Sequence, residues 1–312
     1  MYKKFAVVTI AAVYFLILVG GVVRATGSGM GCPDWPKCFG MWVPPTVEEQ
    51  LPFNYQEIFG EKLKGEVEFN AFKTWTEYVN RLLGVAIGLL IFGTLLGAWL
   101  KYRKSSKKIV RVSLLAFILV GLEGFLGSKV VSSELNPVLI TLHLVLAIGV
   151  VLALIYALFL AYSFEDEAFI KSNRSYRFGV LILMLLSFAQ LLLGTQIRQM
   201  IDVASFSGMP RAEWIDAIAE GRFYMHIAMA VVVLVAHTWF VRNVRKGEGG
   251  KMTWLDWLLA LVVLEFVTGA VLGMLDIPAF AQPIHLTLAT LIMGIQFMAF
   301  LIFGKRRSLE VL

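Results

Sequence analysis

Eight apolar runs of about 20 residues dominate this sequence and leave few folds open to it. A helix needs about 20 such residues to cross the hydrocarbon of a bilayer. The runs are too long for barrel strands and lack their alternation of polar and apolar side chains. The composition agrees, because 58% of the residues are hydrophobic and only 16% are charged, less charge than a soluble domain carries. We therefore predict an all-α, polytopic membrane protein with eight helices, near 5–26, 79–100, 112–131, 138–162, 178–198, 223–241, 253–275 and 284–303.

The basic residues gather at one end of this predicted bundle. Most of the Lys and Arg residues precede the first run, follow the last, or join runs two to three, four to five and six to seven. Basic loops stay in the cytoplasm, so we expect both termini there, in a bacterial inner membrane. Because Gly27-Ser28-Gly29 is a poor cleavage site, we interpret the first run as an uncleaved anchor. The net charge of +6 is then a topology signal, and we expect no nucleic-acid partner.

The two cysteines, Cys32 and Cys38, both fall in the first outer loop. Thiols on the outer face of such a membrane tend to oxidise, so we favour a local disulfide. A metal site is disfavoured because the loop has no histidine, and a redox-active thiol pair is a third interpretation.

The second half of the chain repeats the first. Glu123 and His143 recur as Glu265 and His285, with the same spacing within each pair. When the halves are aligned on these pairs without gaps, further identical residues coincide: Gly127 with Gly269, Leu144 with Leu286, Leu146 with Leu288, and Ala147 with Ala289. Each half has an even number of runs, so the two halves have the same orientation in the membrane. We predict two parallel four-helix bundles, residues 1–165 and 166–312, with an extended outer loop at 27–76.

The repeated histidines are the best indication of function. His226 and His285 begin the sixth and eighth runs, so two helices of one bundle present imidazole at the same depth. Haem iron accepts two axial imidazoles from opposite faces, and a four-helix bundle provides the slot between its helices. We predict that this pair holds a haem. The alternative is a pair of hydrogen-bonded core histidines.

The first half keeps only one of these histidines. His143 matches His285, but Asn80 stands where His226 predicts a histidine. A haem with an open face can bind and activate oxygen, whereas a doubly ligated haem suits electron transfer. The halves would then divide catalysis and electron transfer between them, with loss of function in the first half as the alternative.

Glu77 lies one helical turn before Asn80 and is followed by Arg81. Its carboxylate would form a simple ion pair with Arg81, or act as a proton acceptor or charge partner at the haem edge. Basic residues at the outer helix ends would contact haem propionates or lipid phosphate; these include Arg24, Arg198 and Arg222. Glu123 and Glu265 would be proton carriers or structural carboxylates. We interpret His237 as a histidine whose hydrogen bonds are made within the bundle.

The block TGSGMGCPDWPKC at 26–38, the block EYVNRLLG at 77–84 and the Leu-His and Ile-His pairs of runs four and eight resemble haem A synthase, the CtaA/Cox15 family of cytochrome oxidase assembly. The resemblance covers the whole chain. It implies a haem-dependent membrane oxidoreductase that acts on a CH group and oxidises the C8 methyl of haem O to a formyl group by successive hydroxylations. It also implies that Glu77 is catalytic, that His226 and His285 hold haem b, that the first half (His143, Asn80, Arg81) holds the substrate haem, and that Cys32 and Cys38 form a disulfide. Many members read Glu-x-x-His-Arg where this chain has Asn80, and the third outer loop lacks the second cysteine pair of some members.

The resemblance implies haem O as the substrate and the lipid bilayer as the surroundings. A haem O synthase, an electron donor and a second copy of the chain are partners that it leaves open. Two other functions compete: a non-catalytic membrane b-type cytochrome, and a haem carrier or chaperone. Asn80 counts against the first because an electron relay would keep both haems six-coordinate. Glu77 counts against the second because a carrier would not need that carboxylate.

Overall fold

The computed structural model describes residues 1–60, 68–165, 173–247 and 254–304. Within these ranges it contains no β-strand, and eight helices are long and apolar enough to cross a membrane. The prediction of an all-α, multi-pass membrane protein is therefore confirmed. The eight helices are α1 (Tyr2–Ala25), α3 (Ala71–Tyr102), α4 (Lys107–Ser132), α5 (Pro137–Glu165), α6 (Arg174–Phe206), α8 (Gly221–Gly247), α9 (Trp254–Met274) and α10 (Ala281–Gly304).

Some of the predictions fall on residues outside the described ranges. These are the junction at 165–166 proposed between the halves, the part of the outer loop at 61–67, and the basic residues Lys171, Lys251, Lys305, Arg306 and Arg307.

Two helices extend well beyond their predicted apolar runs. α3 already begins at Ala71, because the side chain of Asn70 caps it by accepting from the amide of Lys73 at 3.1 Å. α6 continues to Phe206 at its outer end. At 1.5 Å per residue these helices are roughly 50 Å long, against about 30 Å of hydrocarbon. Each helix is therefore longer than the hydrocarbon layer is thick, and hydropathy does not detect its additional turns.

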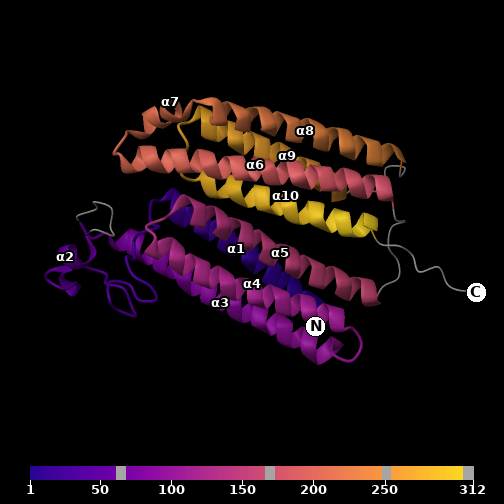
Figure 1. Ribbon diagram of the computed structural model, residues 1–312, viewed down its shortest axis with the longest axis horizontal. Coiled ribbons are helices and arrows are strands. Elements are labelled where there is room, and N and C mark those ends of the chain that lie inside the picture. The colour runs from indigo at the N-terminus through magenta and orange to yellow at the C-terminus, as the bar shows by residue number, and fades with distance from the viewer. Residues whose placement is uncertain (61–67, 166–172, 248–253, 305–312) are drawn as a thin grey trace, which may run out of the picture.

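The helices of each half contact one another in the same cyclic order (Figure 1). In the first half α1 contacts α3, α3 contacts α4, α4 contacts α5, and α5 returns to α1. In the second half the order is α6, α8, α9, α10 and back to α6. Consequently α3 and α5 are diagonal partners in one bundle, as α8 and α10 are in the other. This order is what the predicted repeat requires, while the exact division of the chain stays a prediction.

The turns that join α4 to α5 and α9 to α10 have the same backbone conformation at equivalent positions of the sequence repeat. In each turn two consecutive residues have positive φ: Glu134 (53°) and Leu135 (65°), then Asp276 (52°) and Ile277 (57°). The amide of the second residue in each pair donates at 2.9 Å to a carbonyl of the preceding helix, that of Val130 or Leu272. Left-handed conformations are uncommon for residues other than glycine, so their recurrence at equivalent positions supports a duplicated helical hairpin.

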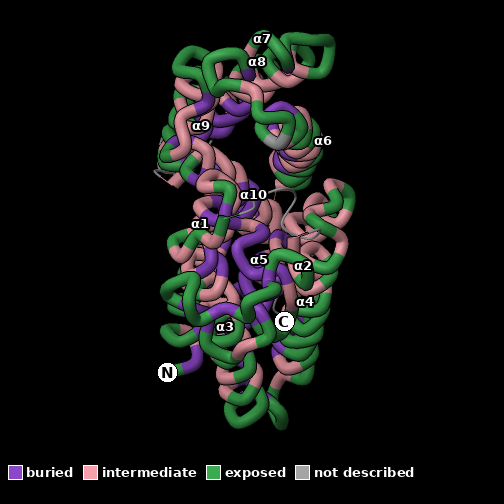
Figure 2. The backbone as a smooth tube through the Cα atoms, turned by 90° about the vertical axis from the view of Figure 1, so that its left-hand side faces the viewer, coloured by how far each residue is buried: buried purple, intermediate pink, exposed green. Residues whose placement is uncertain are grey.

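The two halves meet where α10 packs against α1 and α5. Small residues allow this close approach, as is common between membrane helices. A Cβ on Gly21 of α1 would lie only 2.9 Å from the Cα of Pro283 in α10. Further along the same contact, Tyr14 donates to the carbonyl of Thr290 at 3.4 Å. Figure 2 shows that α5 and α10 carry much of the buried backbone at the centre of the molecule.

The two ends of the bundle are different. The short helices α2 (Tyr55–Phe59) and α7 (Trp214–Ile218) lie at one end, and the N-terminus and the described end of α10 at Gly304 lie at the other (Figure 1). The helix ends on the terminal side carry the described basic residues of 3–4, 101–111, 174–177 and 242–246. This arrangement agrees with the charge pattern on which the predicted topology rests.

Candidate functional site

His226 and His285 lie on diagonal helices of the second bundle, each in the second turn of its helix. Both therefore stand near the end of the bundle at which α8 and α10 begin. The Nε2 atom of Gln190 in α6 lies 3.4 Å from His226 Nε2 and donates to the His226 carbonyl at 3.1 Å. His226 Nδ1 is buried and has no hydrogen-bond partner among the described residues. The structure thus places the two histidines that the sequence paired on diagonal helices of one bundle, at equivalent positions.

His143 and Asn80 occupy the corresponding diagonal helices, α5 and α3, of the first bundle. The Oδ1 atom of Asn80 is buried without a hydrogen-bond partner in the described part of the chain. The His143 side chain is 40% exposed, whereas that of His285 is 24% exposed. The His143 imidazole is therefore more accessible than that of His285.

A glycine on the neighbouring helix faces each of these four side chains. With no Cβ, glycine leaves room for the ring or amide beside it. An added Cβ would lie 3.3 Å from His226 Cε1 at Gly194, 3.3 Å from His143 Cε1 at Gly127, 3.1 Å from His285 Cε1 at Gly269, and 4.0 Å from Asn80 Oδ1 at Gly20. Asn80 therefore lies beside Gly20 just as His226 lies beside Gly194. This supports the alignment of Asn80 with His226. Sequence reasoning paired Gly127 with Gly269 without assigning them a role.

Glu123 and Glu265 contact the repeated histidines directly. Glu123 Oε1 lies 3.1 Å from His143 Nδ1, and Glu265 Oε1 lies 3.2 Å from His285 Nδ1. The hydroxyl oxygen of Thr268 also lies 3.1 Å from His285 Nδ1. Sequence reasoning left the partners of these carboxylates open. The signal that it missed is that the position midway between each Glu and its His, 133 or 275, falls in the turn between their helices.

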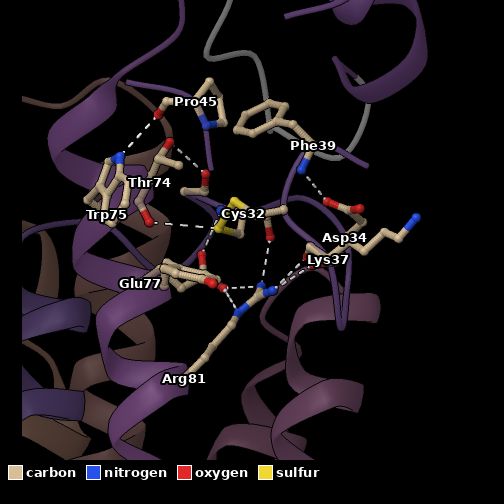
Figure 3. Close-up of a disulfide and its surroundings, with 12 residues drawn as sticks. Cys32, Asp34, Lys37, Phe39, Pro45, Thr74, Trp75, Glu77 and Arg81 are labelled. Carbon is tan, nitrogen blue, oxygen red and sulfur yellow. Dashed lines mark hydrogen bonds and ion pairs between the residues drawn. A yellow bond between two sulfur atoms is a disulfide. The ribbon is translucent and has the colours of Figure 1, made fainter. Parts of the chain in front are cut away.

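Glu77 lies under the first outer loop and is 4% exposed. Figure 3 shows its carboxylate between that loop and Arg81. Its Oε2 accepts from the amide of Cys32 at 2.8 Å, and its Oε1 accepts from Arg81 Nε at 3.1 Å. Arg81 in turn donates to the carbonyls of Asp34 at 2.7 Å and Lys37 at 3.0 Å. Glu77 and Arg81 therefore hold the loop onto α3, a role that sequence reasoning did not assign to them.

We call the described part of this loop, residues 26–60 and 68–70, the cap. Cys32 and Cys38 form a disulfide within it, which confirms the favoured prediction. Gly31 packs so tightly on α3 that a Cβ there would clash with the backbone of Lys73. The outer turns of α3 supply three more hydrogen bonds: Thr74 to the Gly31 carbonyl at 2.9 Å, Trp75 to Pro45 at 3.1 Å, and Tyr78 to Trp42 at 2.6 Å. The cap thus covers the end of the first bundle that lies opposite the N-terminus (Figure 1).

Two of the three outer arginines converge on one carboxylate. Arg24 in α1 and Arg198 in α6 contact Asp202 at 2.6 and 2.8 Å. Arg198 also donates to the carbonyl of Arg24 at 3.2 Å and to the side chain of Gln282. This cluster ties the halves together at the outer end, and sequence reasoning did not anticipate Asp202. Arg222 is exposed and lies 3.6 Å from Glu220.

His237 is fully buried in the second bundle. Its Nδ1 lies 2.7 Å from the carbonyl of Val233, and its Nε2 lies 2.7 Å from Nε2 of Gln296. Gln296 also donates to Ser187 at 2.8 Å. The histidine is hydrogen-bonded within the bundle, as the sequence analysis predicted.

Residues 3–297 match the model of the COX15-CtaA family, cytochrome oxidase assembly protein. The chain belongs to this family. Membership of the COX15-CtaA family extends over both bundles and the cap, and so over every candidate residue described above. The family match therefore covers nearly the whole chain and reaches all eight described helices that are long and apolar enough to cross a membrane.

Three relatives named heme A synthase show how far the likeness reaches. The protein of Shewanella oneidensis is 28% identical over 137 residues, which cover 44% of this chain and 38% of that one. The protein of Sinorhizobium medicae is 35% identical over 134 residues, covering 41% of this chain and 36% of that one. The protein of Alkalihalophilus pseudofirmus is 24% identical over 281 residues, 86% of this chain and 85% of that one. The chain thus spans under two fifths of the length of the first two relatives and most of the third.

The second bundle has the features that a haem held by two histidines needs. Two imidazoles stand on diagonal helices, and one of their ring nitrogens is buried without a partner in the described residues. Gly194 and Gly269 let both rings pack closely against the neighbouring helices. Imidazole is a common axial ligand of haem iron, so the residues present fit this group. In the first bundle only His143 can supply such a ligand, since an amide is a poor one.

Proposed function

We propose that this protein is a haem A synthase. In this proposal it oxidises the C8 methyl of haem O to a formyl group by successive hydroxylations, in the biosynthesis of haem A for cytochrome oxidase. One observation carries the proposal. The second bundle has histidines on both diagonal helices, His226 and His285, whereas the first has His143 on one helix and Asn80 on the other. Membership of the COX15-CtaA family and relatives named heme A synthase support it.

In the proposal the second bundle holds the cofactor. His226 and His285 would hold haem b, which when bound supplies one-electron transfer. Its propionates would face the outer helix ends, where Arg24, Arg198 and Arg222 lie. Arg24 and Arg198 already share Asp202, so two guanidinium groups with one carboxylate leave a net positive charge for an acidic group.

The first bundle would hold the substrate, haem O. His143 is the proposed ligand, and its greater exposure supports exchange of substrate for product. Asn80 would leave the opposite face without a protein ligand. Its buried Oδ1, which has no partner among the described residues, is an acceptor for a hydrogen bond from a bound molecule.

Glu77 is the proposed catalytic carboxylate. Its two oxygens accept from Cys32 and Arg81, so the same group would both assist the reaction and close the outer end of the first bundle. The cap that Glu77 and Arg81 hold would keep water from the substrate, which strengthens every charge interaction in the site.

The topology belongs to the proposal as well. We place the protein in the inner membrane of a bacterium, with both termini in the cytoplasm and the cap outside. The support is the basic helix ends on the terminal side of the bundle.

The test is expression of the full chain, under aerobic conditions, in a host that makes haem O but no haem A. We expect haem A among the extracted haems. Glu77→Gln should abolish it, while Glu49→Gln, an exposed carboxylate of the same cap, should leave it unchanged. Recovery of only haem B and haem O from well-folded protein would instead favour a b-type cytochrome or a haem carrier.

A further inference from the structure

The contact between a glutamate and a histidine is made twice, once in each bundle, with nearly the same geometry. The Oε1–Nδ1 distance is 3.1 Å for Glu123 and His143 and 3.2 Å for Glu265 and His285. Both carboxylates are well shielded, with side chains 15% and 18% exposed. A carboxylate within a membrane bundle is costly unless something pairs with it. In both carboxylates Oε2 is buried without a hydrogen-bond partner in the described part of the chain, so the histidine is the main polar neighbour.

We propose that Glu265 and Glu123 are positioning residues for the haem ligands. Each carboxylate takes the Nδ1–H of its histidine, which fixes the ring and leaves the Nε2 lone pair for iron. The inference rests on the proposed function, because it takes His285 and His143 to be the residues that bind haem.

The hydrogen bonds around His285 determine which ring nitrogen carries the proton. A neutral imidazole has one N–H and one lone pair. The Thr268 hydroxyl donates to the backbone carbonyl of Glu265 at 2.9 Å, so its oxygen faces His285 Nδ1 as an acceptor. Two acceptors, the Thr268 oxygen and the Glu265 carboxylate, therefore flank Nδ1. The proton stays on Nδ1, and Nε2 is the free donor atom.

The two axial positions of the second bundle are consequently unequal. His285 has a carboxylate and a hydroxyl at Nδ1, whereas Nδ1 of His226 has no partner among the described residues. A carboxylate behind a ligating imidazole makes it a stronger donor and adds negative charge near the metal. Both effects favour the ferric over the ferrous state and so lower the reduction potential of the haem. Glu265 would therefore set the driving force for the electron that this haem passes on.

The two bundles also differ in the residue that accompanies the glutamate beside the histidine. In the gap-free alignment of the two halves, Thr268 falls on Leu126. Nδ1 of His143 has Glu123 alone beside it, at 3.1 Å and outside normal hydrogen-bond geometry, so this ring should respond more strongly than His285 to loss of its carboxylate.

The test uses the full chain, purified with its haem, and the variant Glu265→Gln. Gln keeps the size of the side chain and removes its charge. We expect the potential of the second-half haem to rise by an amount equivalent to a tenfold change in the ratio of ferrous to ferric affinity, about 59 mV for one electron. Haem retention during dilution should weaken by roughly 10- to 100-fold, as for other partners of metal ligands. Glu123→Gln is the matched control, because it should leave this potential unchanged.

A carboxylate that only stabilises the fold would change the melting temperature and leave the potential alone. Glu265→Gln with bound haem, wild-type potential and wild-type retention would therefore overturn this proposal and leave the proposed function standing. A wild-type chain that binds no haem would overturn both. If Glu265→Gln does not fold, the iron–histidine stretching band of ferrous haem at His143 gives the answer, since Glu123→Gln should lower its frequency. An unchanged band would overturn the proposal.

Discussion

At the scale of single residues, one position decides how the two halves differ. Asn80 and His226 occupy equivalent places, each facing a glycine of the preceding long helix. An imidazole at this position gives iron a second strong ligand, whereas an amide leaves that face open. The chemistry proposed for each half therefore depends on this one difference in side chain.

Asn80→His should convert the first half into a site like the second. We expect the haem of the first half to become six-coordinate and low-spin and to leave the protein more slowly. Absorption and electron paramagnetic resonance spectra of the purified protein would measure the spin state. A first-half haem that stays high-spin in this variant would show that position 80 does not face the iron.

Each glycine beside a ligand should also be sensitive at this scale. Gly269→Ala places a Cβ 3.1 Å from His285 Cε1, closer than ordinary contact, so the ring must move and the haem b content should fall severalfold. Gly273→Ala in the same helix meets open space, and the helix should gain about 1 kcal/mol from the better helix former. The haem-to-protein ratio of the two variants would measure the difference. Equal ratios would contradict the role given to Gly269.

At the scale of elements, the cap and the outer turns of α3 form one unit. The side chains of Thr74, Trp75, Glu77, Tyr78 and Arg81 all bond to the cap. The disulfide closes a short ring inside it, which limits the disorder of the unbonded loop. The cap therefore holds Glu77 in place as much as Glu77 holds the cap.

Replacing Cys32 and Cys38 by Ser should loosen the cap and leave the second bundle intact. For a ring this small, the loss of chain constraint amounts to about 2 kcal/mol. We expect faster proteolysis within residues 26–60 and lower haem A production, with an unchanged spectrum of the second-half haem. Cleavage at the wild-type rate would show that the α3 contacts alone hold the cap.

The sequence predicts much of this structure because hydropathy and thiol chemistry act locally. The eight spans follow from apolar length, and the Cys32–Cys38 disulfide follows from location outside the membrane. The contacts of Glu123 and Glu265 join different helices, so no local pattern predicts them. One signal was present: position 133, midway between Glu123 and His143, falls in the turn after α4. Residues equally far from the turn of a helical hairpin face each other. The links made by Asp202 across the halves, and by Glu77 to the cap, join segments far apart in the chain and have no local signal.

At the scale of the whole molecule, two similar bundles would each hold a different haem. α10 packs on α1 and α5, so the two candidate sites lie in bundles fixed side by side. That arrangement would let an electron pass from the haem of the second half to the substrate of the first without any movement of the helices.

The central claim is that each half holds a different haem, and the most direct test is to identify the haems retained by two variants. The full chain would be purified from a host that makes haem O, as wild type, His285→Ala and His143→Ala, and its haems extracted and identified by mass. The account predicts haem B together with haem O or haem A in the wild type. His285→Ala should lose haem B alone, and His143→Ala should lose haem O and haem A alone. Loss of the same haem from both variants, or retention of haem B only through His143, would contradict the account.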